Sequence, residues 1–552
     1  MPKYRTKRTK NRSFHGNRFT NANQSVEEPA TATATASKLI MNDCAELKDE
    51  VNGRNELKRN RIMDIFILNC VFSALCCPQC LKTGLKLTED SRFGLCSDFT
   101  LTCKCGYMNG FTSTAKIGRK STLNSLLVLG LRLIGKGFTA GKKLLCTVNL
   151  PFMSKSTFRR HEYQLFKAVR CAPDKNMKEA ATEVRTKTKT SSCGVSVDGT
   201  WQRRGHNSLN GCVSAISIDT GKVLDLEPMS LYCRYCDKKK NNDDHVCRNH
   251  VGSSASMETV GAYRIFDRSK QCKRLKYTKY YGDGDSNVFN AVKDIYGPDS
   301  VEKLECIGHV QKRVGSRLRN LKKKQKGLGG KGKLTDKLID KLQNYYGIAI
   351  RSNIGNLQNT QSAVIAAFYH CCSGKNKQMH KQCPKGGDSW CKYQRAVHEG
   401  KVFVEKSPGL PNDIINSIKT TYMSLCDSNL LSICLHGKTQ NNNESFNNVI
   451  WTILPKETFV EMQSLTLGVN IAVLLFNSGY LGLLDVFKNL GVSLGQETVK
   501  NFSLMDSERV KSAKRHSLPT SKLSRKKRKS AKKAKLLNFQ VKEGVTYKCG
   551  EF

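Results

Sequence analysis

The sequence predicts an α/β fold whose largest domain contains a mixed β-sheet with the element order βββαβαβ. Three features predict it: alternating apolar strands open the domain, an amphipathic helix follows, and a second helix separates two later strands. A Thr-Gly turn also joins the second and third strands as a tight hairpin. The expected strands are residues 194–201, 211–219, 222–230, 275–281 and 304–307, and the expected helices are 257–269 and 288–296.

Length and charge narrow the classes of protein. The chain has 552 residues, enough for three or four folded units. Its 92 Lys and Arg exceed its 46 Asp and Glu, giving a net charge of +46 that indicates a polyanionic partner, above all nucleic acid. The longest apolar stretches, 62–77 and 467–487, are interrupted by polar residues, and the basic N-terminus lacks an apolar signal segment. We therefore expect neither a membrane protein nor a secreted one.

Both ends of the chain are predicted to be basic and disordered. Residues 1–60 have no acid before Glu27 and cannot bury enough apolar surface to fold. Residues 501–552 form a basic tail, in which 509–535 contains thirteen Lys and Arg and no acid, so that it repels itself and stays extended. The run at 525–529 is typical of a nuclear localisation signal, whereas the simpler interpretation is a solubilising tail. We expect a nuclear protein.

The 24 cysteines indicate metal sites, because many occur at CxxC or CxxH spacing in a large chain. Residues 61–118 are predicted to form a zinc-ribbon-like region, since two close pairs are separated by a hairpin-length spacer of 22 residues. Buried cysteines without a metal are the alternative, and Cys76 and Cys96 are left over. The four expected Zn²⁺ ligands are Cys77, Cys80, Cys103 and Cys105.

Two further groups have ligand spacing. An insert at 231–252 has a CCCH pattern around a strongly polar segment with no core of its own, and a metal would supply its folding energy. Its expected Zn²⁺ ligands are Cys233, Cys236, Cys247 and His250, with His245 as a substitute. A weaker group has His380, Cys383 and Cys391, with His370, Cys371 or Cys372 as the fourth ligand. All three groups are expected to be structural, because no open coordination position is evident.

Residues 119–175 are predicted to be helical, with helices at 121–134, 139–148 and 154–169. They form a candidate helix-turn-helix DNA-binding region, although a helical linker packed on the main domain is an equal alternative. In the DNA-binding interpretation, Arg159 and Arg160, together with His161, face phosphates or bases.

Acidic residues at two places in the sequence indicate a candidate catalytic site. Asp198 lies in the first expected strand, and a Gly-Asp-Gly-Asp turn with Asp283 and Asp285 follows the fourth. In the predicted sheet these strands are neighbours, so the carboxylates can share divalent cations such as Mg²⁺ or Mn²⁺. Three antiparallel strands with an acid in the first resemble the opening of a ribonuclease H-like fold. A turn that only ends a strand is the alternative for the acidic doublet.

Several motifs together resemble the Mutator-like transposases. They are Val197-Asp198-Gly199-Thr200-Trp201, Arg204-Gly205-His206, Gly282–Ser286, Cys306-Ile307-Gly308-His309 and Asn443-Glu444-Ser445-Phe446-Asn447. The resemblance covers roughly residues 75–500 and implies an Asp-Asp-Glu site with Asp198 first, Asp283 or Asp285 second and Glu444 third. It also implies the family's CxxH signature, Cys306 and His309. His309 either packs in a turn or orients a phosphate or metal-bound water.

The resemblance also implies a transposase domain at 190–500 with a helical insertion at about 310–435. The gap of 161 residues from Asp283 to Glu444 fits such an insertion. A basic helix at 310–326 would begin it, and its side chains are either solvated or clamp phosphates. The residues expected to bind nucleic acid there are Lys312, Arg313, Arg317 and Arg319.

Three functions remain open at this point. The first is a DNA transposase that binds terminal inverted repeats and target DNA as double strands, acts as a homo-oligomer, and cleaves and transfers strands. The second is a domesticated, transposase-derived DNA-binding or chromatin protein without catalysis. The third is another ribonuclease H-like nuclease.

Overall fold

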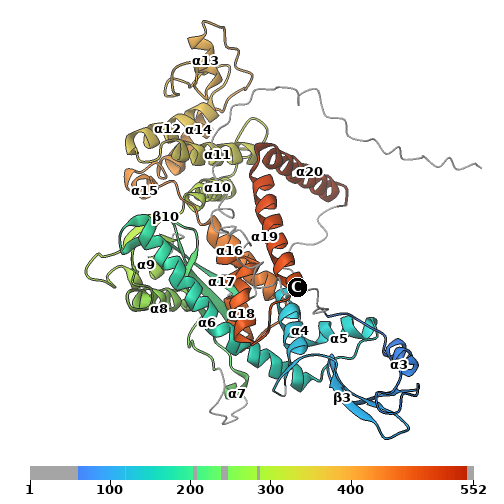
Figure 1. Cartoon of the computed structure of the whole chain (residues 1–552). Coiled ribbons are helices and arrows are strands. Elements are labelled where there is room, and N and C mark those ends of the chain that lie inside the picture. Colours follow the sequence, from blue (N-terminus) through green and yellow to red (C-terminus); the bar gives the residue numbers. More distant parts are fainter. Residues whose placement is uncertain (1–59, 119, 203–207, 238–246, 283–285, 544–552) are drawn as a thin grey trace, which may run out of the picture. The chain divides into compact units, whose positions relative to one another are not determined.

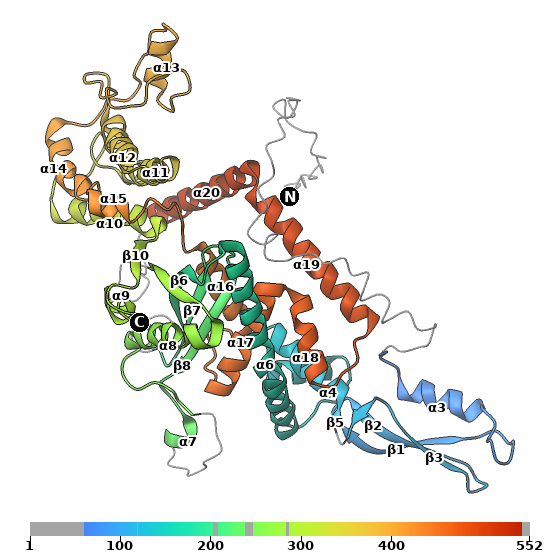
Figure 2. The same cartoon turned by 60° about the vertical axis from the view of Figure 1, so that its left-hand side comes forward.

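A five-stranded mixed sheet carries the candidate site (Figure 2). Its strands are β6 (Ser192–Gln202), β7 (Asn210–Ser217), β8 (Val223–Ser230), β9 (Lys276–Gly282) and β10 (Glu302–Glu305). The order across the sheet is β10-β9-β6-β7-β8; β6, β7 and β8 are antiparallel neighbours, whereas β9 is parallel to β6 and β10 is parallel to β9. With α8 (Ser256–Lys273) and α9 (Ser286–Val292) between the later strands, the predicted βββαβαβ order of a mixed sheet is confirmed.

The structure, a computed structural model, describes residues 60–118, 120–202, 208–237, 247–282 and 286–543. The chain divides into two compact units, residues 38–511 and a second unit that combines 1–37 with 512–552. The predicted N-terminal arm lies almost wholly outside the described residues.

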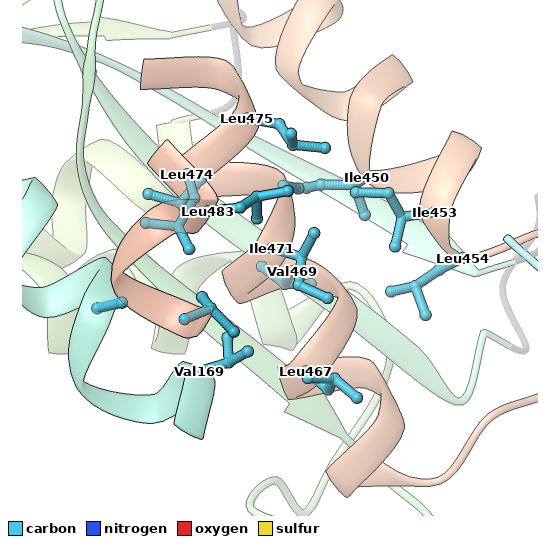
Figure 3. Packing of buried hydrophobic residues seen from close by; sticks show 14 of the residues in the cluster. Val169, Ile450, Ile453, Leu454, Leu467, Val469, Ile471, Leu474, Leu475 and Leu483 are labelled. Carbon is cyan, nitrogen blue, oxygen red and sulfur yellow. The ribbon is translucent and has the colours of Figure 1, made fainter. Parts of the chain in front are cut away.

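The sheet separates two apolar cores because successive side chains of a strand point to opposite faces. Val195 and Val197 of β6 belong to a core shared with Ile265 and Phe266 of α8. On the other face, residues of β7 and β8 join α16 (Asn441–Ile453), α17 (Met462–Ser478) and α6 (Lys155–Thr188). Figure 3 shows this second core, in which Leu467 and Ile471 lie near Ile450 and Val169. The packing fixes α16 against the sheet.

Between β10 and α16 the chain is helical and has a core of its own. Its elements are α10 (Ile307–Lys324), α11 (Asp336–Ser352), α12 (Leu357–Cys372), α13 (Lys392–His398), α14 (Asn412–Met423) and α15 (Ser428–Ser432). Both ends of this helical segment are hydrogen-bonded close to the end of β10. The backbone N–H of Glu305 donates to the carbonyl of Ile433, and that of Ile307 donates to the carbonyl of Lys438. The helical segment therefore begins and ends beside one strand.

The N-terminal part contains α3 (Ile65–Ala74) and an antiparallel sheet of β1 (Lys86–Phe93), β2 (Cys96–Thr102) and β3 (Met108–Thr112). A short pair, β4 (Lys116–Ile117) with β5 (Lys120–Ser121), leads into α4 (Thr122–Leu133) and α5 (Phe138–Thr147). The third predicted helix is capped by Ser154 and continues well beyond residue 169, to Thr188, as α6. It passes through Pro173 because its C-terminal half buries Ala180, Ala181 and Val184 under the main sheet.

The C-terminal part corrects one prediction. After η1 (Tyr480–Leu483) and α18 (Leu484–Asn489), the chain forms α19 (Gln496–Ser517) and α20 (Pro519–Glu543) (Figure 1). The basic run at 509–535 is thus helical and not extended. Proline suits the first helical position, and residues 520–543 have no Gly or Pro and many Lys, Arg and Ala, which favour helix. None of the helices described is long and apolar enough to cross a membrane.

Candidate active site and metal centres

Asp198, the first predicted acid, lies on β6. It contacts α16, the helix that carries Glu444, the third predicted acid. The side-chain amide of Asn447, on α16, donates a hydrogen bond of 2.7 Å to Oδ2 of Asp198. Asp198 pairs with Ser214 of β7, so its backbone is fixed in the middle of the sheet. A hydrogen bond to an ionised acceptor is stronger than one between neutral groups. This contact therefore helps to hold β6 against α16.

Other side chains of α16, and that of Gln440 just before it, also contact β6. Four side chains at helical spacing reach the strand: Gln440 donates to the carbonyl of Val197, Asn443 to that of Ser196, Asn447 to Asp198, and the indole of Trp451 to the Thr200 hydroxyl. Their separations of three, four and four residues place them on one face of the helix. From sequence, Asn443 and Asn447 were named only as part of a motif, and Gln440 and Trp451 were not predicted. Their polar spacing could have indicated a stripe, but not the strand that it contacts.

Glu444 lies one helical turn before Asn447, and residues three apart on a helix are neighbours, with about 5–6 Å between Cβ atoms. Its side chain is exposed, and Oε1 lies 3.9 Å from Nζ of Lys312 on α10. A cavity of about 520 Å³ brings Glu444 together with the residues around Asp198. The lining residues are Thr200, Glu444, Asn447, Asn448, Trp451, Pro455, Lys456 and Glu457. The predicted second acid, Asp283 or Asp285, lies outside the described residues.

Cys306 and His309 lie where β10 turns into α10. Cys306 is the residue that precedes the helix, and its buried sulfur accepts a hydrogen bond of 3.4 Å from the backbone N–H of Gln440. His309 is half-buried in the first turn of α10, where its backbone N–H donates to Cys306. The CxxH pair therefore joins the start of α10 to the residue that precedes α16.

The first cysteine group assembles as predicted. The sulfurs of Cys77, Cys80, Cys103 and Cys105 lie within 4.8 Å of one another, with Cys77 to Cys105 at 3.6 Å and Cys80 to Cys103 at 3.7 Å. Zn–S bonds of about 2.3 Å give tetrahedral S···S edges of about 3.8 Å, so the group fits zinc. Burial alone would raise the pKa of Cys77, but the backbone N–H groups of Cys80 and Gln79, together with the thiols of Cys105 and Cys103, lower the pKa to about 7.

The second group is only partly as predicted. Cys233, Cys236 and Cys247 come together, with 3.3 Å between the last two sulfurs. His250 does not join them: it is buried and its Nε2 pairs with the hydroxyl of Ser256 at 2.9 Å, at the start of α8. The structure therefore does not place His250 with the three cysteines, and its hydrogen bond is with Ser256 instead. The substitute, His245, lies outside the described residues.

The third group, which the sequence indicated only weakly, is complete. His370, His380, Cys383 and Cys391 place one ligand atom each within 4.8 Å of all the others. Three residues were candidates for the fourth ligand. His370, at the end of α12, lies with the other three ligands, whereas Cys371 and Cys372 lie in the apolar core. Burial, with Lys341 nearby, lowers the pKa of His370 to about 4, so its imidazole is neutral and can bind a metal.

The predicted nucleic-acid-binding residues differ in their contacts. Arg159 and Arg160 are exposed on α6. His161 is not: it is buried and bonded to the Ser125 hydroxyl at 2.9 Å, which corrects the expectation that it faces DNA. On α10, Lys312 is exposed, but the three arginines bind protein groups. Arg313 pairs with Glu305 at 2.7 Å, Arg317 contacts Ser424 at 3.0 Å, and Arg319 pairs with Asp340.

The chain combines a mixed sheet, a cavity lined by Glu444 and Glu457, and three cysteine-containing groups that could hold metal ions, and these features are those of a metal-dependent nucleic-acid-binding class of protein. Comparison with protein families matches residues 59–391 to the Mutator-like transposases, which is more than half of the chain. The chain therefore belongs to the Mutator-like transposase family, which implies DNA binding and DNA processing. The matched range includes Asp198 and the CxxH pair and ends before Glu444. No curated protein matched the chain.

Proposed function

We propose that this transposase cleaves DNA at transposon ends and transfers the strands, using an Asp-Asp-Glu site with Asp198 first and Glu444 third. The observation that carries the proposal is the 2.7 Å hydrogen bond from Asn447 to Asp198. It holds the helix of Glu444 beside the strand of Asp198, although the two acids are 246 positions apart in sequence.

The strand order supports a ribonuclease H-like core. Three antiparallel strands are followed by two that run parallel to the first, with the first strand, β6, at the centre of the sheet. Because β6 is the central strand, Asp198 can lie close both to side chains that follow β9 and to side chains of α16. This is the arrangement that a site with acids from distant parts of the chain requires.

We propose Asp283 or Asp285 as the second acid, because both follow shortly after β9, the parallel neighbour of β6. The last described pair between these two strands is Ser196 with Tyr281, two residues before Asp198 on β6. Asp283 and Asp285 themselves lie outside the described residues.

The oxygen donors in this region fit a hard cation such as Mg²⁺ or Mn²⁺. Besides the two carboxylates, Oδ1 of Asn447 is buried and has no hydrogen-bond partner in the described part of the chain. Carboxylate and amide oxygens are the ligands that Mg²⁺ prefers. Asp198, Glu444 and the second acid would hold the cations, and such cations would supply activation of a water or 3′-hydroxyl and stabilisation of the leaving oxygen. Asn447 orients Asp198 for that task.

Lys312 and His309 complete the proposed site from α10. Because the Lys312 ammonium lies 3.9 Å from Glu444, it can neutralise excess negative charge there and contact a substrate phosphate. His309, in the first turn of the same helix, orients a phosphate or an attacking water. We further propose double-stranded DNA as the partner, a homo-oligomer as the active form, and nuclear import through the basic run at 525–529.

A strand-transfer assay with Mg²⁺ or Mn²⁺ tests the function. The full chain should cleave and join its own transposon ends. Asp198→Asn and Glu444→Gln should each lower the rate by about 10²–10³-fold while binding DNA normally, which is the scale of removing a preorganised charge-stabilising group. Asp219→Asn is the matched control. Asp219 is in the β7–β8 hairpin, next to the start of β6, and its backbone carbonyl accepts from Lys187.

Other outcomes separate the alternatives. End-specific binding without cleavage by the unaltered chain would favour a domesticated DNA-binding protein. Cleavage of RNA–DNA hybrids without specificity for ends would favour another nuclease of this fold.

A further inference from the structure

Residues 373–411, which connect α12 to α14, lack an apolar core of their own. No fully buried member of the helical core lies between Cys372 and Ile414, a stretch that is described without gaps. α13, within this connection, buries only Gln394, and Val402 and Val404 are largely exposed. A segment of this length must gain its folding energy from something other than apolar burial.

The most buried side chains of this region are instead metal-ligand types. His380, Cys383 and Cys391 are each at most 3% exposed, and they converge on His370 at the end of α12. The two Nδ1 atoms of His370 and His380 are 3.2 Å apart, and the sulfurs of Cys391 and Cys383 lie 3.5 and 3.9 Å from Nδ1 of His380. A zinc tetrahedron with Zn–N of about 2.05 Å and Zn–S of about 2.3 Å has N···N and N···S edges of about 3.3 and 3.6 Å.

A second observation concerns the other side of His380. Its Nε2 lies 3.1 Å from Oε2 of Glu405 and 3.0 Å from the hydroxyl of Ser373. Glu405 can only accept when ionised, so Nε2 of His380 carries the proton and Nδ1 presents its lone pair to the other three ligand atoms. Metal-binding histidines are usually held in this way by a carboxylate. Apolar packing alone would not require a carboxylate that holds Nε2 of His380 protonated in this way.

We propose that His370, His380, Cys383 and Cys391 bind one Zn²⁺ that folds residues 373–411, with Glu405 as the residue that positions His380. Four protein ligands leave no open coordination position, so the site is structural. The proposal does not depend on the Asp-Asp-Glu chemistry, and neither result affects the other.

Zinc content gives the first test. The full chain and Cys383→Ser/Cys391→Ser are purified in parallel, and their bound zinc is measured by mass spectrometry. The double variant should contain about one Zn²⁺ fewer per chain. Cys372→Ser, a buried cysteine outside the group, should keep the full content. Equal zinc in the full chain and the double variant would overturn the proposal.

Hydrogen exchange gives a second test that needs no ligand variant. In the unaltered full chain, removing zinc with a chelator should expose the amides of residues 373–411, and Zn²⁺ but not Mg²⁺ should restore protection. In Glu405→Gln, the free Zn²⁺ needed for half-protection should rise about 10–100-fold. Glu399→Gln is the matched control, since Glu399 pairs with Lys401 at the surface. Exchange in 373–411 that is unaffected by zinc, or equal zinc requirements in the two glutamate variants, would refute the assignment.

Discussion

The side-chain amide of Asn447 donates a 2.7 Å hydrogen bond to the carboxylate of Asp198, and this contact connects the central strand of the sheet to the helix that carries Glu444. The two residues are 249 positions apart in sequence. Between them, the chain completes the sheet and the helical segment from α10 to α15 before it returns to β6. The contact is therefore a property of the whole fold and a sensitive point for testing it.

Asn447→Ala should lower strand-transfer activity by about 10–100-fold, because a hydrogen bond to a charged group contributes about 1.5–3 kcal/mol and Asp198 would lose its orientation. Single-turnover rates, measured beside DNA affinity, would test this. Asn448→Ala is the control, since Asn448 is exposed at the next helical position and lines the same cavity. If both variants behave alike, the hydrogen bond is not what orients Asp198.

Lys312→Gln should change stability little, because its ion pair with Glu444 joins two side chains that are each more than 60% exposed. Its effect should appear in DNA binding, where the slope of log affinity against log salt should fall by about one. Fluorescence anisotropy over a salt series measures that slope. Lys500→Gln, an exposed lysine of α19, is the control, and an equal change in both would show that Lys312 contributes only bulk charge.

Cys306→Ala should destabilise the protein by about 1–3 kcal/mol, because the backbone N–H of Gln440 would lose its acceptor next to the active-site helix. Cys306→Ser keeps an acceptor and should recover part of the loss. Denaturant unfolding of the two variants gives the comparison. Equal stabilities would mean that the sulfur serves only to fill space.

Zinc removal should unfold the N-terminal antiparallel sheet before the main sheet. The apolar cluster beside β1–β3 has the buried members Cys77, Leu85 and Leu101, and Cys96 and Phe99 of β2 are also buried, so this core is small and the metal group must supply much of the stability. Hydrogen exchange after chelation should expose β1–β3 and leave β6 and β7 protected. Cys77→Ser should reproduce the effect, whereas Cys96→Ser, a buried cysteine outside the group, should not. Protection that survives chelation would contradict a structural zinc.

The sheet could be predicted from sequence because strand alternation is local information. Residues 194–201 and 211–219 showed the period of two that a strand needs to separate two cores, and the βββαβαβ order followed from it. Cysteine pairs at short spacing were also informative, since the turn between two ligands brings them together without help from the rest of the fold. This is why the close pairs Cys77 with Cys80 and Cys103 with Cys105 could be named from sequence as candidate ligands.

Other features depended on tertiary contacts. His161 and His250 have ligand or DNA-contact chemistry, but Ser125 and Ser256 hold them inside the protein. The extension of α6 beyond Pro173 depends on what its second half covers. Asn447 could be named as part of a motif, yet its role requires knowing that α16 crosses β6, and no local pattern contains that information.

The central claim is that Asp198 and Glu444 hold the same metal ion. Crystals of the full chain grown with transposon-end DNA and Mn²⁺ would test it through the anomalous signal of manganese. We expect an ion with a carboxylate oxygen of Asp198 and one of Glu444 both within bonding distance, about 2 Å. Manganese bound elsewhere, with the two carboxylates sharing no ion in the DNA complex, would contradict it.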